Sequence, residues 1–349
     1  METPEEIESR YYIGYLFTNT STEAFAFKIM KCYINPIASI FGFFANLMSL
    51  AILVRSGLKK SSNILLFGLA LADSMCMLMT VNIAEILIYF DPAKSDPKYC
   101  CWQYDYIVAY ILYMLFTAAY FIGGWGCYTN SFIPVFVTAE RLAAVFWPIT
   151  FSRKITKTTA AVWVISAFMF WLPFCTLYLC IYSFEYVNIS NTLTGGITHP
   201  SFFKDFDIDS LYLLDSYVFE ALSSWVPFII VIVGCTAICI KIRITLRARR
   251  EKLSSTKKVQ WSVRTTRTLL VTCFVFVATH SLFSLIYYIF QPNLDNSNSS
   301  YLCYEVMNFF YLINNSSNFF IYVLCDNKLY LIFLQIMHLD KRKPTLKRE

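Results

Sequence analysis

Seven long apolar stretches, separated by polar or charged joints, dominate the hydrophobic pattern of this chain. They cover roughly residues 33–54, 64–90, 107–139, 159–182, 214–240, 266–290 and 303–325. A bilayer core of about 30 Å is crossed by about 20 helical residues, and each stretch is at least that long. The apolar residues run continuously rather than at every second position, which favours helices over barrel strands. The pattern therefore predicts an all-α membrane protein with a seven-transmembrane helix bundle.

Composition supports this prediction. The chain is 57% hydrophobic and 15% charged, with a mean hydropathy of +0.52, which differs from the profile of a soluble globular protein. The stretches divide the chain into an N-terminal segment at 1–32, a transmembrane domain at 33–325 and a tail at 326–349. Within the tail, Lys328–Met337 is predicted to form a short amphipathic helix on the inner leaflet.

The segments that connect the apolar stretches alternate in charge. Basic residues collect at 55–60, 153–157, 241–267 and 341–348, and the other joints are acidic or neutral. The positive-inside rule then predicts a multi-pass protein of the plasma membrane with its N-terminus extracellular and its C-terminus cytoplasmic. The basic rim is expected to face membrane lipid, so the net charge of +6 does not indicate nucleic acid. Three sequons on outer segments are the predicted glycosylation sites: Asn19, Asn188 and Asn298.

Ionisable and amide side chains within the apolar stretches are costly in lipid, and they therefore mark candidate functional sites. Asp73 is a carboxylate in the middle of the second stretch, and Asn130, Asn314 and Asn318 lie at comparable depth. A carboxylate among amides suits a small hard cation with oxygen ligands. We therefore expect bound sodium or a proton at this cluster and no other cofactor. The alternative is a structural carboxylate hydrogen-bonded to neighbouring helices.

Short motifs follow one another along the stretches in a specific order and spacing. They comprise Gly42 and Asn46 in the first stretch, Asp73 in the second, Glu140, Arg141 and Pro148 at the end of the third, Trp163 and Pro173 in the fourth, Pro227 in the fifth, and Asn314, Asn318 and Tyr322 in the seventh. The set resembles the G-x-x-x-N, D/E-R-Y and N-P-x-x-Y motifs of the rhodopsin-like (class A) G-protein-coupled receptors, with Phe319 replacing the last Pro. Within that family, the chain is most similar to divergent invertebrate orphan receptors of the peptide or chemosensory type.

The resemblance implies a receptor that senses an extracellular peptide or small-molecule ligand and activates a heterotrimeric G protein. The residues expected to serve G-protein coupling are Glu140, Arg141, Pro148, Asn318 and Tyr322. Gly123 stands where aminergic receptors carry an Asp, and the seventh stretch has no Lys for a retinal Schiff base. The chain is therefore expected to be neither a typical amine receptor nor an opsin.

The cysteines depart from the family pattern. Phe116 replaces the third-span Cys, and the partner Cys of the second outer loop is also absent. We favour a replacement bridge from Cys100 or Cys101 to Cys180, although the outer cysteines allow other pairings. The remaining apolar cysteines are expected to be small core residues: Cys76, Cys127, Cys175, Cys235 and Cys239.

Aromatic and acidic side chains near the outer ends of the stretches form the candidate ligand site. The candidates are Glu85, Trp125, Tyr217, Glu220, His280, Tyr287 and Glu305. Aromatic faces and carboxylates favour a cationic ligand. The three Glu are preferred because no Lys or Arg lies near them within their stretches. For the aromatic residues the alternative is the ordinary interfacial belt or packing between helices, and for His280 it is a hydrogen bond in the interior.

Two other functional classes were weighed. A secondary transporter or channel is the main alternative, but the stretches show no internal repeat of the kind that transporters carry. An enzyme is not expected, because the three His, at 199, 280 and 338, form no H-E-x-x-H motif.

Overall fold

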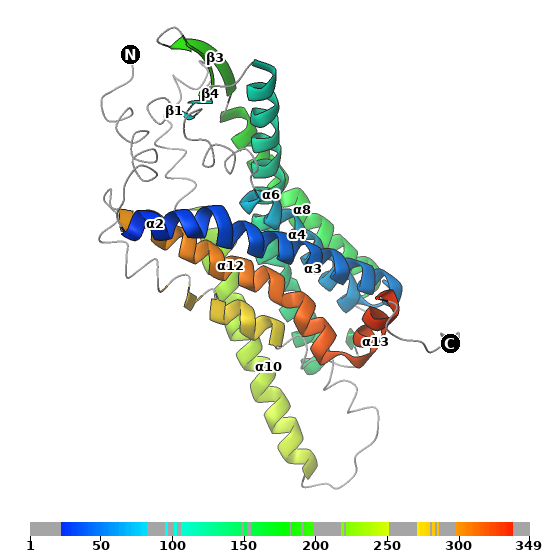
Figure 1. Ribbon diagram of the computed structural model, residues 1–349. Coiled ribbons are helices and arrows are strands. Elements are labelled where there is room, and N and C mark those ends of the chain that lie inside the picture. The colour runs from blue at the N-terminus through cyan, green and yellow to red at the C-terminus, as the bar shows by residue number, and fades with distance from the viewer. Residues whose placement is uncertain are drawn as a thin grey trace.

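The computed structural model describes residues 22–81, 95–96, 101–102, 106–147, 150–151, 155–181, 183–189, 192–198, 218–219, 221–250, 271–279, 281–282, 285 and 298–337. These residues are almost entirely helical, with a small sheet at one end of the bundle (Figure 1). Five of the described helices are long and apolar enough to cross a membrane, or six if the bent pair α12–α13 counts as one span. The prediction of a helical membrane protein is confirmed. The sixth apolar stretch is described only in part, at 271–279, 281–282 and 285.

The first span begins earlier than its hydropathy suggested. Helix α2 (Thr22–Ile29) continues through the π-helical turn η1 (Met30–Ile34) into α3 (Asn35–Ser56). Pro36, near the start of α3, has no N–H to donate to the preceding turn. The wider π-turn accommodates this, and the Asn35 N–H bonds to the Met30 carbonyl. α3 ends at Gly57, whose φ of 90° is a conformation that favours glycine.

The other helices follow in chain order. They are α4 (Ser61–Thr80), α6 (Tyr106–Phe146), α8 (Lys157–Ile181), η4 (Ala221–Trp225), α10 (Val226–Arg250), α12 (Asn298–Cys325) and α13 (Asn327–Ile336). With 41 residues, α6 is about 60 Å long at 1.5 Å per residue, about twice the thickness of a bilayer core. One end of α6 therefore extends beyond the membrane, and the sheet lies beside that end (Figure 1).

The sheet pairs two connecting segments that are far apart in the sequence. Its strands are β1 (Ser95–Asp96), β2 (Cys101–Trp102), β3 (Ser183–Ile189) and β4 (Thr192–Thr198). All pairs are antiparallel and the order is β1-β2-β4-β3, with β3 and β4 forming a hairpin. The sequence analysis predicted no strands here. β1 and β2 have two residues each and leave no alternating pattern to detect, whereas β3 and β4, with seven residues each, were missed.

Helix α4 lies at the centre of the bundle and packs closely against α6. A Cβ atom added at Gly126 of α6 would lie 2.6 Å from the Ala72 carbonyl oxygen of α4, which only glycine avoids. At this close approach the Cα atoms of Cys76 and Cys127 are 4.8 Å apart, and the two cysteines form a disulfide. The expectation that they are separate core residues is therefore wrong. Their helical positions alone did not show how near the two helices lie.

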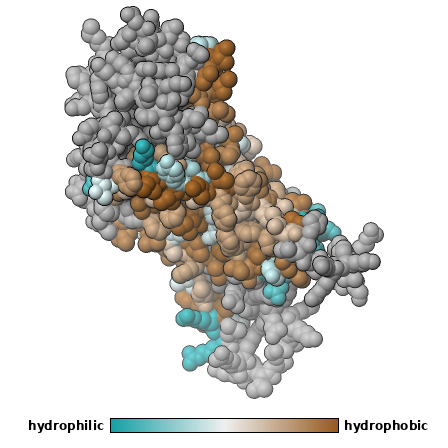
Figure 2. Space-filling model, in the orientation of Figure 1, coloured by the Kyte–Doolittle hydropathy of each residue, from teal (hydrophilic) through white to brown (hydrophobic). Residues whose placement is uncertain are grey.

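The other core cysteines are free and differ in exposure. Cys175 is buried, as predicted, and Cys235 is partly buried. Cys239 is exposed on α10, so its assignment to the core is wrong. Val233 and Ile240 of the same helix are also exposed. The described surface that Figure 2 shows is largely hydrophobic, as expected for a surface that faces lipid.

Helix α13 corresponds to the amphipathic helix predicted for the tail. It follows α12 after a bend of 99°. Asp326 caps its N-terminus by accepting hydrogen bonds from the backbone N–H groups of Lys328, at 2.8 Å, and Leu329, at 3.5 Å. The Leu329 side chain is buried, and the Phe333 ring packs edge-on against Phe319 with centroids 5.6 Å apart. The apolar face of α13 therefore packs against the end of the bundle at which α12 ends.

Candidate functional site

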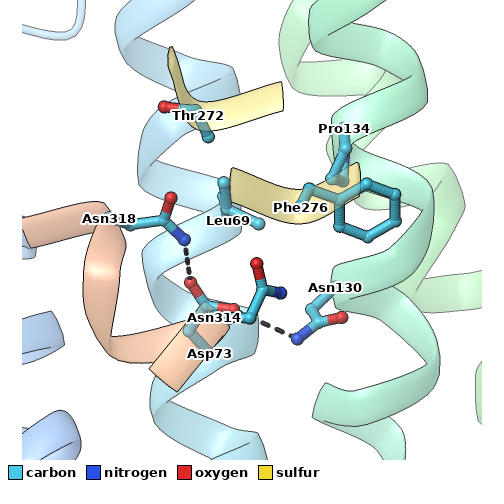
Figure 3. Close-up of a pocket in the computed structure, with 8 residues that line it drawn as sticks. All are labelled: Leu69, Asp73, Asn130, Pro134, Thr272, Phe276, Asn314 and Asn318. Atoms are coloured by element: carbon cyan, nitrogen blue, oxygen red, sulfur yellow. Dashed lines mark hydrogen bonds between the residues drawn. The ribbon is translucent and has the colours of Figure 1, made fainter. Parts of the chain in front are cut away.

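Asp73 lies at the centre of a hydrogen-bonded network between α4, α6 and α12 (Figure 3). Its carboxylate is 1% exposed. Oδ1 accepts a hydrogen bond from Asn130 Nδ2 at 3.1 Å, and Oδ2 accepts one from Asn318 Nδ2 at 2.8 Å. Within the described residues, no Lys or Arg forms an ion pair with this carboxylate. Neutral amide donors therefore stabilise a carboxyl group that is buried between three helices.

Asn315, the residue after Asn314 on α12, forms more of the hydrogen bonds in this network than Asn314 does. Its Oδ1 accepts from Asn130 Nδ2 at 3.0 Å and from Asn314 Nδ2 at 3.3 Å. Its Nδ2 donates to Cys76 Sγ at 3.4 Å, and its backbone carbonyl accepts from Asn46 Nδ2 at 3.0 Å. The sequence analysis did not assign Asn315 to the site, because two adjacent Asn at one helical turn from Asn318 cannot be told apart by spacing.

Tyr311 is a further member that the sequence analysis missed. Its hydroxyl donates to Asn130 Oδ1 at 3.3 Å. Tyr311, Asn315 and Asn318 are spaced i, i+4 and i+7 and so lie on one face of α12. This polar spacing within an apolar stretch is the signal that could have identified the face.

A small cavity opens beside the network (Figure 3). Its volume of about 10 Å³ is enough for one water or a small ion. It is lined by Leu69, Asp73, Asn130, Pro134, Thr272, Phe276, Asn314 and Asn318. The cavity size and the Asp73 carboxylate fit a sodium ion. Asn130 and Asn318 turn N–H groups toward Asp73, so in this state they are hydrogen-bond donors and not oxygen ligands.

Glu140 and Arg141 form an ion pair near the C-terminal end of α6. Glu140 Oε2 lies 2.8 Å from an Arg141 guanidinium nitrogen, with side-chain exposures of 2% and 11%. Ser61, at the start of α4, donates to the other carboxylate oxygen at 2.6 Å. The motif therefore connects α6 to α4. Ser61 was not among the predicted residues, and Pro148 lies outside the described residues.

Tyr322 is buried near the same end of the bundle, 1% exposed, within the main apolar core. Its hydroxyl and the Arg141 Nε have no hydrogen-bond partner within the described part of the chain. Two buried donors are therefore available for new partners if the helices rearrange. Asn318, one turn before Tyr322, is already bonded to Asp73.

Lys60 marks the basic rim just before α4. Partial burial and the charge of Lys328 on α13 lower its pKa, Arg141 also lowers it, and Asp326 opposes these effects. Cations from three segments therefore gather at the inner end of the bundle.

Near the outer end of α12, Glu305 has partners that the sequence analysis did not foresee. Lys31 Nζ lies 3.1 Å from Glu305 Oε1, and Asn35 Nδ2 donates to Oε2 at 2.7 Å. No cation lies near Glu305 within its own stretch, which is why it is a preferred ligand candidate, but the inference that it lacks a cationic partner is wrong. Lys31 comes from the π-turn η1, far away in sequence. The role of Glu305 in ligand binding remains a prediction.

Trp125 packs between helices. Its Nε1 donates to the Phe168 carbonyl of α8 at 2.8 Å, and the two rings meet edge-on with centroids 5.6 Å apart. These contacts match the packing role that was weighed as the alternative. The other ligand candidates lie outside the described residues: Glu85, Tyr217, Glu220, His280 and Tyr287.

The predicted outer modifications also remain predictions. Asn19 and Cys100 lie outside the described residues. Cys101, Cys180, Asn188 and Asn298 lie on described strands or helices, but their side chains are outside the described set.

Comparison with known proteins places the chain in a family. A family model described as "Serpentine type 7TM GPCR chemoreceptor Srw" matches residues 33–326, a range that contains all seven apolar stretches. Among curated proteins, none matches the chain. The resemblance to G-protein-coupled receptors, and to their chemosensory members, is confirmed. The chain belongs to the Srw family of serpentine seven-transmembrane chemoreceptors, and it is a multi-pass membrane protein of a receptor family.

Proposed function

We propose that the protein is a plasma-membrane receptor that binds an extracellular peptide or small organic ligand and activates a heterotrimeric G protein. The observation that carries this proposal is the Glu140–Arg141 ion pair, buried near the inner end of α6 and tied to Ser61 of α4. A transporter has no evident need for such a pair at this end of its bundle. The basic inner joints support a cytoplasmic C-terminus.

The proposed mechanism is a shift between two populated states. The ligand binds the active state better than the resting one, and the difference in affinity sets the size of the shift. In the resting state, Glu140 holds the Arg141 guanidinium within the bundle. In the active state, Arg141 turns to the G protein and to the buried Tyr322 hydroxyl, which has no partner within the described residues.

The polar network is proposed to couple the outer and inner ends of the bundle. Asp73 and the cavity beside it would hold a sodium ion, with Asn314 nearby, and the ion would neutralise the carboxylate charge. Asp73 also holds Asn318 of α12. Any movement of α12 that breaks this bond changes the environment of the carboxylate, so ion occupancy and receptor state are linked.

For the ligand, the acidic and aromatic candidates near the outer ends support a cationic group. Glu305 supports it less than the others, because Lys31 already neutralises it.

The test is nucleotide exchange on purified G protein by the full-length receptor in lipid nanodiscs, screened with peptides and small odorants. Arg141→Ala should lose ligand-stimulated exchange while its surface expression stays normal. Arg55→Ala, at an exposed basic residue at the inner end of α3, is the matched control and should keep full exchange. Normal stimulated exchange in Arg141→Ala would show that the motif is only an interfacial anchor. Substrate flux without nucleotide exchange would favour the transporter.

A further inference from the structure

Two free cysteines on neighbouring helices meet close to the coupling motif. Cys235 lies on α10, and Cys273 lies on the helical segment 271–279. Both belong to one apolar cluster with Val231 and Phe276. Cys273 is 3% exposed, and Cys235 is only partly buried. Two helices that must move relative to each other in an opening bundle therefore bring their cysteines into one packed cluster.

A third helix completes the site. Thr138 Oγ1 of α6 lies 3.6 Å from Cys273 Sγ, and the same hydroxyl donates to the Pro134 carbonyl at 2.8 Å. Since the Thr138 proton is engaged there, its oxygen can accept the Cys273 S–H, and the Cys273 sulfur can accept the Cys235 S–H. α10 lies this close to α6 because Gly234 has no side chain, and an added Cβ there would clash with Thr138 Cγ2.

We propose that Cys235 and Cys273 are an oxidation site at which a peroxide forms a disulfide that ties the fifth span to the sixth and holds the receptor in its resting state. Formation of the bond rests only on the packing of the two cysteines in this cluster. Its effect on signalling rests on the proposed receptor function. Cys239, one turn after Cys235 on α10 but exposed, is outside this cluster.

The reaction balances with peroxide as the oxidant. The Cys273 sulfur attacks one oxygen of hydrogen peroxide, the O–O bond breaks, and the departing hydroxide takes the thiol proton to leave as water. The Cys235 sulfur then attacks the resulting sulfenic acid, and the S–O bond breaks. The released hydroxide takes the Cys235 proton to form a second water. Two thiols lose two electrons and two protons, and one peroxide becomes two waters.

Two features place this bond where it matters for coupling. Arg141 follows Thr138 by one turn of α6, so the bond would lie close to the coupling motif. Thr272 and Phe276, on either side of Cys273, line the cavity of Asp73 (Figure 3). The sixth stretch has no Pro or Gly, so we expect it to move as one straight helix. A single bond to α10 would then restrain the whole span.

The experiment uses the full-length Glu140→Gln receptor in nanodiscs, because its raised basal exchange needs no ligand. Hydrogen peroxide should give a peptide pair linked through Cys235 and Cys273 in mass spectrometry. It should also lower basal exchange at least about fivefold, and dithiothreitol should reverse both effects. Cys235→Ser and Cys273→Ser should resist peroxide in both measurements, whereas Cys239→Ser should respond like its parent.

The outcomes separate the two proposals. Absence of the linked peptide pair after peroxide would overturn the oxidation site. A linked pair with unchanged basal exchange would overturn the restraint on signalling. If no variant shows basal exchange, the proposed function is in doubt. The restraint is then judged by the unfolding midpoint, which the bond should raise by several degrees in the parent and not in Cys235→Ser. An unchanged unfolding midpoint after peroxide would overturn the proposed restraint.

Discussion

Replacing Glu140 with Gln removes the negative charge that pairs with Arg141 while preserving the shape of the side chain. In the structure, Glu140 Oε2 lies 2.8 Å from the guanidinium, and both side chains are almost fully buried. The bond from Ser61 goes to the other oxygen, which Gln can still provide. The substitution therefore removes one interaction and keeps its neighbour.

The expected change in the population of the active state follows from the burial of the ion pair. A hydrogen bond to a charged group contributes about 1.5–3 kcal/mol, and each 1.4 kcal/mol changes an equilibrium about tenfold. An active state populated at about 1% without ligand would rise to between about 10% and about 60%. The upper part of this range applies if the pair is absent from the active state. The lower part applies if Glu140 keeps part of this interaction in the active state.

The assay is ligand-free nucleotide exchange by equal amounts of purified receptor. Glu140→Gln should raise basal exchange about tenfold or more for the reason just given. Glu23→Gln changes an exposed carboxylate on α2 in the same way and should leave basal exchange unchanged. Equal basal exchange in Glu140→Gln and the parent receptor would refute the argument that this pair holds the resting state.

Four further substitutions test other parts of the structure. Asp73→Asn should abolish the sodium dependence of basal exchange and of agonist affinity, because the amide lacks the charge that attracts the ion. Lys31→Met should lower the unfolding midpoint, because it leaves Glu305 buried without its cation, at a cost of about 3–5 kcal/mol. Gly126→Leu should reduce surface expression severely, because its side chain would force α6 away from α4. Cys180→Ser should reduce surface expression if the outer bridge forms, since a native disulfide contributes about 2–5 kcal/mol.

Each of these has a control or a contradicting result. Undiminished sodium dependence in Asp73→Asn would exclude an ion at that carboxylate. Lys28→Met changes an exposed Lys of α2 and should leave the midpoint unchanged, and an equal midpoint in Lys31→Met would mean that its ion pair adds no stability. Gly124→Leu is the matched control for Gly126→Leu, because a Cβ at Gly124 meets no atom within 4 Å. Detection of Cys180 as a free thiol by peptide mapping would contradict the outer bridge.

The class of fold and the residues that are costly to bury follow from the sequence alone. Lipid offers no hydrogen-bond partners, so a run of about 20 apolar residues has one stable solution, the helix. The same cost makes Asp73 and the Glu140–Arg141 pair conspicuous within apolar stretches. Their involvement in buried networks was therefore predictable from position alone.

Only the tertiary structure decided which side chains meet. Asn315 and Asn314 are equivalent by helical spacing, and the rotation of α12 against α6 places Asn315 at the centre of the network. Glu305 was expected to lack a cation, but the π-turn before α3 brings Lys31 to it.

The cysteines show the same division. Burial of each was expected from hydropathy, whereas the bond between Cys76 and Cys127 depends on the close approach that Gly126 allows between α4 and α6. The hydropathy of each segment, taken separately, determines which residues enter the membrane. The contacts depend on the distances and rotations between helices, and these are determined by the side chains of all helices together.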